Sequence, residues 1–385
     1  MNSIKLVNDT ISKDDIDYLV EWLKKYPRLT KGPITEEFEK KFAKKMDSKY
    51  AVFCNSGSSA NLLMFQCMLE NDLVSKASKV VVPALSWATD YSPVIQLGFK
   101  PILCDVNLKD LSIDIEHFEK ICRTEKPSAL ILVSVLGLVP DMNKILEICN
   151  EHNVILIEDN CESLGSKFNN KLLGNFGVMS SFSTYFGHHI STIEGGFITT
   201  NDEDIYSTLL MLRNHGWDRD LSADRQKDLR KKWNIDKFNS LYTFYLNGFN
   251  FRSTDLQAYI GLKQVDKIDY ICDKRQDNFH FYQKYIKENI LEIQKRDNDF
   301  ISNFAYPIVS HKKKEIVQKL ENNNVEVRPL IAGSIGNQPF YKKDYGFKDL
   351  PNANKIDNFG FYIPNHPGLT EKEINFISQI INGGH

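Results

Sequence analysis

Two adjacent histidines, His188 and His189, follow Ser183 in the segment SSFSTYFGHHISTIEGGFITT at residues 180–200. An imidazole has an unperturbed pKa of about 6.5, so it can accept or donate a proton near neutral pH. Adjacent side chains usually point in different directions, and at most one of the two is expected to be catalytic. A pair of surface or interface histidines is the alternative. The neighbouring residues lack the spacing of metal ligands, so we expect no metal site.

A turn of small residues precedes a predicted helix in the segment CNSGSSANLL at 54–63. Gly57, Ser58 and Ser59 are expected at the N-terminus of that helix. Backbone amides and the helix dipole favour a phosphate there, and serine hydroxyls add donors. The alternative is that Ser59 only caps the helix.

A carboxylate is predicted at the end of a strand in the segment VILIEDNCESLG at 154–165. Ligands of open α/β sheets bind beyond the carboxyl ends of the strands. Asp159 could hold a protonated ring nitrogen there, a charge pair that makes a pyridine ring an electron sink. The alternative is that Asp159 or Asn160 caps a following helix.

The elements that must position these residues are short apolar runs separated by amphipathic stretches. The runs lie at 79–85, 101–106, 129–137 and 153–160. This pattern predicts a doubly wound α/β sandwich with a mostly parallel sheet. A long helical pattern from Ser253 leads into α+β order, with strands expected at 303–309 and 325–331. We therefore predict a large cofactor-binding α/β domain at residues 1–265 and a small α+β domain at residues 266–385.

Composition excludes few classes of protein. The net charge of -2 gives no basic field, so we expect neither nucleic acid nor an anionic membrane as a partner. The longest apolar run, at 127–140, is shorter than the ~20 residues of a membrane helix. The start has no apolar signal region, which predicts a cytoplasmic protein. The seven cysteines are odd in number and lack CxxC spacing, so a disulfide framework is not expected.

The order of several motifs is specific. SGSSANL, PALSW, EDNCES, SFST, EGG, RNHGW and GFNFRSTDLQA follow one another along the chain. This order resembles the DegT/DnrJ/EryC1/StrS family of sugar aminotransferases, and the resemblance runs from residues 29–32 to 363–370. It implies the fold-type I architecture and a homodimer that uses pyridoxal phosphate (PLP) on nucleotide-linked ketosugars.

One departure from the family pattern changes the expected chemistry. The family places a lysine five residues after the counterpart of Ser183, and His188 stands there. The nearest lysines are Lys171 and Lys227, so no internal Schiff base can form in this segment. One histidine-bearing branch of the family acts in colitose biosynthesis and removes the C3 hydroxyl of GDP-4-keto-6-deoxy-D-mannose. A second branch needs a four-cysteine iron–sulfur cluster, and only Cys272 follows His188 here.

The resemblance therefore implies a dehydratase that binds pyridoxamine phosphate (PMP) without a covalent bond. His188 would act as the base and take a proton from the methylene carbon of the cofactor. Loss of the C3 hydroxyl would give a 3-deoxy-4-ketosugar and ammonia, and L-glutamate would regenerate PMP. The alternatives are a slow nucleotide-sugar 4-aminotransferase and a catalytically silent PLP-fold binding protein.

The resemblance also assigns roles to individual residues, with Trp87 on the ring face, Asp159 at the ring nitrogen and Glu162 near the ring hydroxyl. Cofactor binding is implied for Gly57, Ser58, Trp87, Asp159, Glu162, Ser183 and Asn250, and substrate binding for Thr30, His215, Arg252 and Arg328. Asn250 and Arg252 are expected to act from the neighbouring subunit. The alternatives are a core position for Trp87, turn and surface roles for Asn250 and Arg252, and structural roles for His215 and Arg328.

Overall fold

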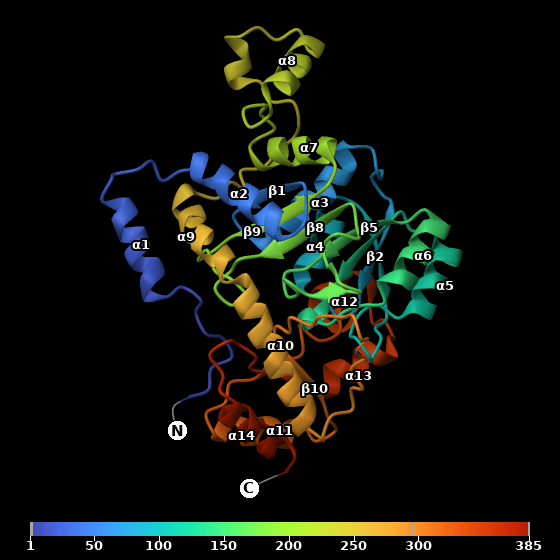
Figure 1. The fold of residues 1–385 in the computed structure, drawn as a ribbon. Coiled ribbons are helices and arrows are strands. Elements are labelled where there is room, and N and C mark those ends of the chain that lie inside the picture. Colours follow the sequence, from blue (N-terminus) through green and yellow to red (C-terminus); the bar gives the residue numbers. More distant parts are fainter. Residues whose placement is uncertain (1–2, 295, 384–385) are drawn as a thin grey trace.

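The structure is a computed structural model that describes residues 3–294 and 296–383. Its centre is a seven-stranded sheet with the order β1-β9-β8-β5-β4-β2-β3 (Figure 1). The strands are β1 (Tyr50–Cys54), β2 (Lys79–Pro83), β3 (Lys100–Cys104), β4 (Ala129–Val133), β5 (Ile155–Asp159), β8 (Met179–Ser183) and β9 (Gly196–Thr200). Strands β3, β2, β4, β5 and β8 run parallel, and β9 is antiparallel to both β8 and β1. The predicted α/β class with a mostly parallel sheet is confirmed.

These strands can consist of apolar residues because helices cover the faces of the sheet. Every residue of β4, ALILV, is buried. Helix α3 (Gly57–Glu70) packs against β8, α4 (Ala88–Gln96) and α7 (Glu203–Arg213), while α5 (Ile115–Glu125) packs against α6 (Met142–His152). Two further helices, α1 (Lys13–Leu23) and α2 (Pro33–Lys45), precede the sheet, and α2 contacts β1. A strand that is covered on both faces needs no polar residues, which explains the continuous runs.

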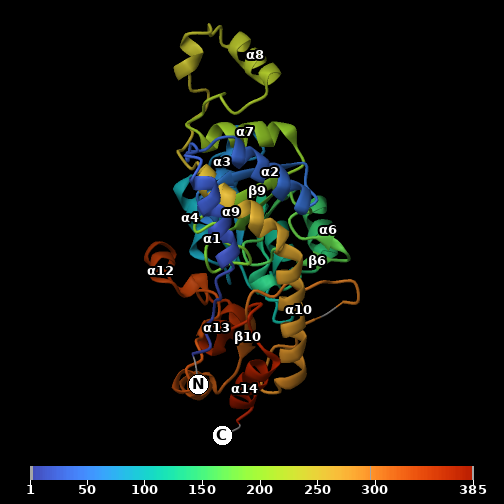
Figure 2. The same ribbon diagram turned by 60° about the vertical axis from the view of Figure 1, so that its left-hand side comes forward.

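The C-terminal part is joined to the sheet by two successive helices, α9 (Asp255–Asp266) and α10 (Ile268–Tyr285). They lead from the large sheet to a three-stranded antiparallel sheet with the order β10-β12-β11 (Figure 2). This sheet and its helices comprise β10 (Tyr306–Val309), α11 (Lys313–Asn322), β11 (Arg328–Pro329), α12 (Pro339–Tyr345), α13 (Pro351–Phe359), β12 (Gly360–Ile363) and α14 (Glu371–Ile381).

The strand expected at 325–331 is shorter than predicted. It is reduced to β11, which lies at an edge of the sheet, where Pro329 has no amide to extend the ladder. The division at residues 265 and 266 falls at the end of α9 and stays a prediction. The start of the chain joins the C-terminal part, since Ile4 forms a bridge with Val325.

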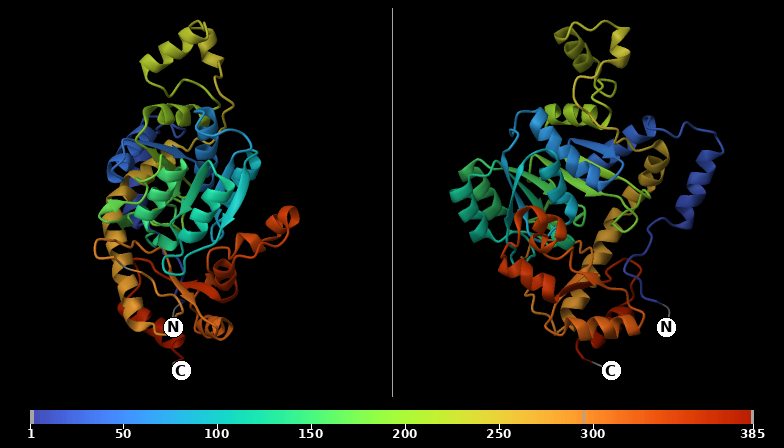
Figure 3. Two further views of the ribbon diagram at one scale, coloured as in Figure 1. Left: turned by 90° about the vertical axis from the view of Figure 1, so that its right-hand side faces the viewer. Right: turned by 180° about the vertical axis from the view of Figure 1, so that it is seen from behind.

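A helical segment projects from the body beyond α7 (Figures 1 and 3). It contains α8 (Ala223–Lys232), which has no buried residue, and a short 3-10 turn at Asn239–Tyr242. Large aromatic side chains are exposed here, including Phe238 at 80% and Tyr242 at 75%.

The seven cysteines are free thiols, and all but Cys161 are buried. Cys54, Cys67, Cys104, Cys122, Cys149 and Cys272 belong to the two apolar cores, as expected for small core residues. Among the described residues, no helix combines the length and apolar character that crossing a membrane requires.

Candidate active site

A pocket of about 500 Å³ lies at the carboxyl ends of β5 and β8. It gathers the predicted residues Gly57, Ser58, Trp87, Asp159, Glu162, Ser183 and His188. The start of α3 forms one wall, and Phe304, Ile331 and Tyr362 of the C-terminal part close the other side. Open α/β sheets bind ligands at this edge, where loops leave the strands.

The turn before α3 has the form of an anion cradle. Helix α3 begins at Gly57, as predicted, but Ser56 is its cap, because Ser56 Oγ accepts from the Ser59 amide at 3.1 Å. The alternative of a Ser59 cap is therefore wrong. A Cβ on Gly57 would lie 2.9 Å from Ser183 Cβ and 3.0 Å from Cys161 Sγ. Only glycine fits there without a shift, and the first amides of α3 stay close to the pocket.

Asp159 ends β5 and is held by two donors. Its Oδ1 accepts from the Cys161 amide at 2.9 Å, and its Oδ2 accepts from Asn61 Nδ2 at 2.6 Å. The side chain is 7% exposed and lines the pocket. No helix follows directly, because residues 161–165 form turns. The alternative of a helix cap is therefore wrong for Asp159.

The two histidines take different positions. His189 is buried, and its Nε2 lies 3.1 Å from the Ser302 carbonyl. His188 lines the pocket, with Nδ1 3.5 Å from Ser183 Oγ and its ring 5.4 Å from that of Phe304. Burial lowers the pKa of His188 to about 4, although the charge of Asp159 partly opposes this. His188 is therefore neutral at pH 7 and able to accept a proton.

Trp87 and Glu162 occupy two other sides of the pocket. Trp87 precedes α4 and is 59% exposed, so the alternative of a core tryptophan is wrong. Glu162 Oε2 accepts from the Leu136 amide at 2.9 Å. Burial raises the pKa of Glu162 to about 7, and the charge of Asp159 adds to this effect. A protonated Glu162 can donate a hydrogen bond into the pocket.

The remaining predicted residues lie outside this pocket. Asn250, Arg252 and His215 form an outer cluster, in which Arg252 Nε donates to Asn250 Oδ1 at 3.0 Å and Arg252 Nη2 lies 3.5 Å from His215 Nε2. Thr30 is exposed and forms a bridge with Thr254. The exposed Arg328 pairs in register with Tyr362, which does line the pocket.

Several pocket residues carried no recognised signal in the sequence. Phe304, Ile331 and Tyr362 come from the C-terminal part, and only the tertiary fold brings them here. Tyr185, Thr89, Asp90, Cys161 and Glu194 also line the pocket. Asp90 did leave a signal: an acidic residue three positions after Trp87 is typical of the first turn of a helix.

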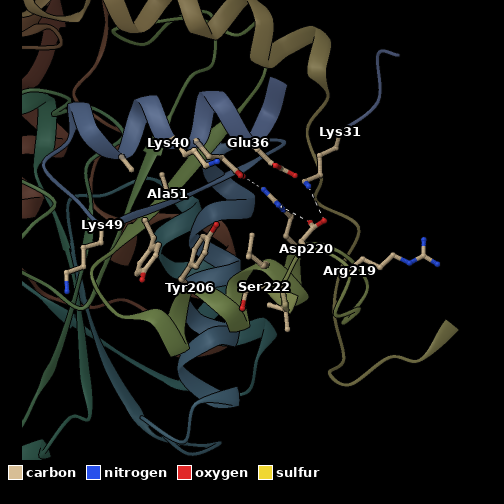
Figure 4. Close-up of a pocket in the computed structure, with 15 residues that line it drawn as sticks. Lys31, Glu36, Lys40, Lys49, Ala51, Tyr206, Arg219, Asp220 and Ser222 are labelled. Atoms are coloured by element: carbon tan, nitrogen blue, oxygen red, sulfur yellow. Dashed lines mark hydrogen bonds and ion pairs between the residues drawn. The ribbon is translucent and has the colours of Figure 1, made fainter. Parts of the chain in front are cut away.

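A second cavity, of about 480 Å³, lies between α2 and α7 (Figure 4). Its centre is Arg213, which is fully buried and paired with Glu39 and Asp220. Lys31 pairs with the same Asp220 at 3.0 Å. Because its buried charges are paired with one another, this cavity has the character of a structural ion-pair network.

Comparison with known proteins identifies the family. Residues 9–382 match the DegT/DnrJ/EryC1/StrS aminotransferase family. The chain is 32% identical to GDP-4-keto-6-deoxy-D-mannose 3-dehydratase of Escherichia coli O55:H7 over 96% of this chain and 97% of that protein. It is 28% identical to the lipopolysaccharide biosynthesis protein RfbH of Salmonella typhimurium over 91% of this chain and 84% of that protein.

Solved structures agree. The E. coli 3-dehydratase with bound hydrated PLP has a TM-score of 0.89 at 30% identity and covers 99% of each chain. The same type of enzyme with a trapped PLP-glutamate geminal diamine also has a TM-score of 0.89, at 30% identity, over 98% of this chain and 100% of the other. The chain belongs to the DegT/DnrJ/EryC1/StrS aminotransferase family.

Proposed function

We propose that this protein is a PMP-dependent 3-dehydratase of a nucleotide-linked 4-keto-6-deoxysugar, with GDP-4-keto-6-deoxy-D-mannose as its substrate. The observation that carries the proposal is a neutral histidine, His188, in the pocket where the family pattern has a lysine. The similarity to 3-dehydratases over nearly the whole chain supports the reaction and the substrate. A cytoplasmic location and a product that leads to colitose belong to the same proposal.

The pocket suits a phosphorylated pyridine. Gly57 allows the start of α3 to lie close to Ser183, which keeps the first amides of the helix at the pocket, and Ser58 and Ser183 add hydroxyl donors. The exposed indole of Trp87 can stack on a flat ring, while Asp159 can pair with a ring nitrogen. When bound, PMP would supply an amine that condenses with the C4 ketone and a ring that relays the electrons of the broken methylene C–H bond towards C3, from which the hydroxyl leaves.

His188 carries the proton transfers in this proposal. Its Nδ1 faces Ser183 Oγ at 3.5 Å, which leaves Nε2 for the reacting groups. The neutral imidazole accepts a proton from the methylene carbon of the cofactor. The resulting imidazolium can then return a proton to the departing C3 hydroxyl, which leaves as water. The low pKa of about 4 favours that second transfer, because a strong acid gives up its proton readily.

Residues 172–226 contain no lysine, and none lines the pocket among the residues that the structure describes. Without a lysine amine in this segment, the protein would hold the cofactor non-covalently, and L-glutamate would be the amine donor that regenerates PMP. Glu162, with a pKa of about 7, can share a proton with the ring hydroxyl. Arg328 is proposed to bind substrate from its position beside Tyr362, which lines the pocket.

We further propose a homodimer in which each subunit completes the site of its partner. Asn250, Arg252 and His215 form a polar cluster outside the pocket of their own chain, and Asn250 is exposed. In the partner's site, Asn250 would bind the cofactor phosphate, and Arg252 and His215 would bind the substrate. Thr30, also exposed, is proposed to contact the substrate.

Product analysis tests the proposal. The protein is incubated with PMP, glutamate and GDP-, CDP- or dTDP-4-keto-6-deoxysugar, and the products are identified by mass spectrometry. We expect ammonia and a 3-deoxy-4-ketosugar from the GDP-linked substrate. A 4-aminosugar would instead identify an aminotransferase, and the absence of any product with all three substrates would favour a binding protein.

A further inference from the structure

Asp90 is an acidic residue of the pocket to which the proposed function gives no role. It lies in the first turn of α4 and is only 1% exposed. It borders the pocket together with Asp159. A carboxyl group that is buried so completely costs free energy unless its oxygens have partners, so those partners indicate what it does.

The oxygens of Asp90 connect two parts of the site. Oδ2 accepts from the Trp87 amide at 3.0 Å, which fixes the backbone at the start of α4. Oδ1 accepts from Asn61 Nδ2 at 3.0 Å, and the same amide group donates to Asp159 Oδ2 at 2.6 Å. Ser181 Oγ donates to Asn61 Oδ1 at 2.6 Å, so the orientation of the Asn61 amide is also fixed.

Asp90 and Asp159 are neighbours in the site, because both carboxyl groups accept from the same Asn61 amide nitrogen. Two neighbouring buried carboxylates cannot both ionise without a large penalty. Burial, and then the charge of Asp159, raise the pKa of Asp90 well above its usual range. Asp90 therefore holds a proton more readily than an ordinary carboxyl group, and in that form its hydroxyl can donate to a neighbouring carboxylate.

The Asp159 carboxylate can accept a further hydrogen bond, which suits a protonated ring nitrogen. A carboxylate accepts about four hydrogen bonds. Asp159 receives two of them from the Cys161 amide and from Asn61, and a protonated Asp90 would be a third donor. One acceptor position is then left for a ligand in the pocket, and the carboxylate that offers it cannot rotate.

We propose that Asp90 is a positioning residue. The hydroxyl of its carboxyl group holds the Asp159 carboxylate, and its Oδ2 holds the backbone amide of Trp87. The partner of the ring nitrogen and the indole on the ring face then keep a fixed relation to each other. This inference rests on the proposed function, because it requires a pyridine ring that contacts both residues.

The test compares Asp90→Asn, Asp90→Ser and Asp90→Leu with the unmodified protein. Asparagine can accept from the Trp87 amide and donate to Asp159. Serine can cap α4 but is too short to reach Asp159, and leucine does neither. Each apoprotein is titrated with PMP labelled with ¹⁵N in the ring, and both the affinity and the ring ¹⁵N chemical shift are measured. Asp114→Leu is the control, because Asp114 caps α5 through the His117 amide at 2.8 Å and lies outside the pocket.

We expect the Asp90→Asn protein to keep the ring-nitrogen shift and an affinity close to that of the unmodified protein. Asp90→Ser and Asp90→Leu should move the shift towards an unprotonated pyridine and weaken PMP by at least about tenfold, as for one lost hydrogen bond to a charged group. The Asp114→Leu protein should be less stable but bind normally.

An unmoved ring signal in Asp90→Ser would overturn the inference, whether or not the affinity falls, because capping alone would then explain the residue. This variant keeps the helix cap, so it remains informative if Asp90→Leu does not fold. Failure of the unmodified protein to bind PMP or PLP would instead remove the proposed function, and this inference with it.

Discussion

Replacement of Gly57 by alanine should damage both the stability of the protein and its cofactor site. Alanine in a first helical turn ordinarily stabilises a protein by about 0.5–1 kcal/mol relative to glycine. Here the new Cβ would lie 2.9 Å from Ser183 Cβ and 3.0 Å from Cys161 Sγ. Carbon atoms pack at about 3.5–4.0 Å, so the methyl group must push the start of α3 away from β8. We expect a net loss of about 1–3 kcal/mol in the free energy of unfolding, the usual cost of overpacking.

The same shift displaces the amides proposed to bind phosphate. Loss of one hydrogen bond to a charged group, at about 1.5–3 kcal/mol, weakens PMP by roughly 10–150-fold. Urea unfolding of the apoprotein measures stability, and equilibrium dialysis measures PMP affinity. Gly187→Ala is the control, because its Cβ would meet no atom closer than 3.6 Å. A Gly57→Ala protein that is as stable as the unmodified protein and binds PMP normally would refute this reasoning.

Three further results are expected. Borohydride reduction of the PLP form, followed by peptide mapping, should find no pyridoxyl-lysine, because 172–226 contains no lysine; a stoichiometric lysine adduct would contradict this. Glu162→Gln should stabilise the protein more at pH 8 than at pH 5. The pKa of Glu162 is about 7 in the folded protein and about 4.3 in the unfolded protein, so ionisation of this residue lowers the stability of the unmodified protein as the pH rises through this window. Thermal melts that show no such pH dependence would be evidence against it. Mixing inactive Asn250→Ala and His188→Asn proteins should restore up to about a quarter of the sites through hybrid dimers, and activity that stays absent although hybrids form would exclude sharing of the site.

The sequence predicts much of the large sheet because four of its seven strands are local apolar runs. The runs at 79–85, 101–106, 129–137 and 153–160 correspond to β2, β3, β4 and β5. Site residues at the strand ends could be predicted from the sequence for the same reason, because the end of a parallel strand places Asp159 at the ligand-binding edge of the sheet. The short length of β11 could not be predicted, because pairing at a sheet edge depends on the partner strand.

Residues that reach the pocket from afar could not be found in this way. Phe304 and Tyr362 enter it only because α10 carries the C-terminal part back against the sheet. The choice between His188 and His189 also needed the fold, which buries His189 against Ser302. A histidine pair has no local pattern that distinguishes the two side chains.

We propose that His188 stands in place of the family's lysine and acts as the base of a dehydration. The most direct measurement is the ammonia released in a single turnover of the PMP form with GDP-4-keto-6-deoxy-D-mannose, compared among the unmodified protein, His188→Asn and His189→Gln. Glutamine at 189 can still donate to the Ser302 carbonyl, so this variant tests the neighbouring histidine with little disturbance. We expect about one ammonia per site from the unmodified and His189→Gln proteins, and almost none from His188→Asn although it still binds PMP. Undiminished ammonia release by His188→Asn would contradict it.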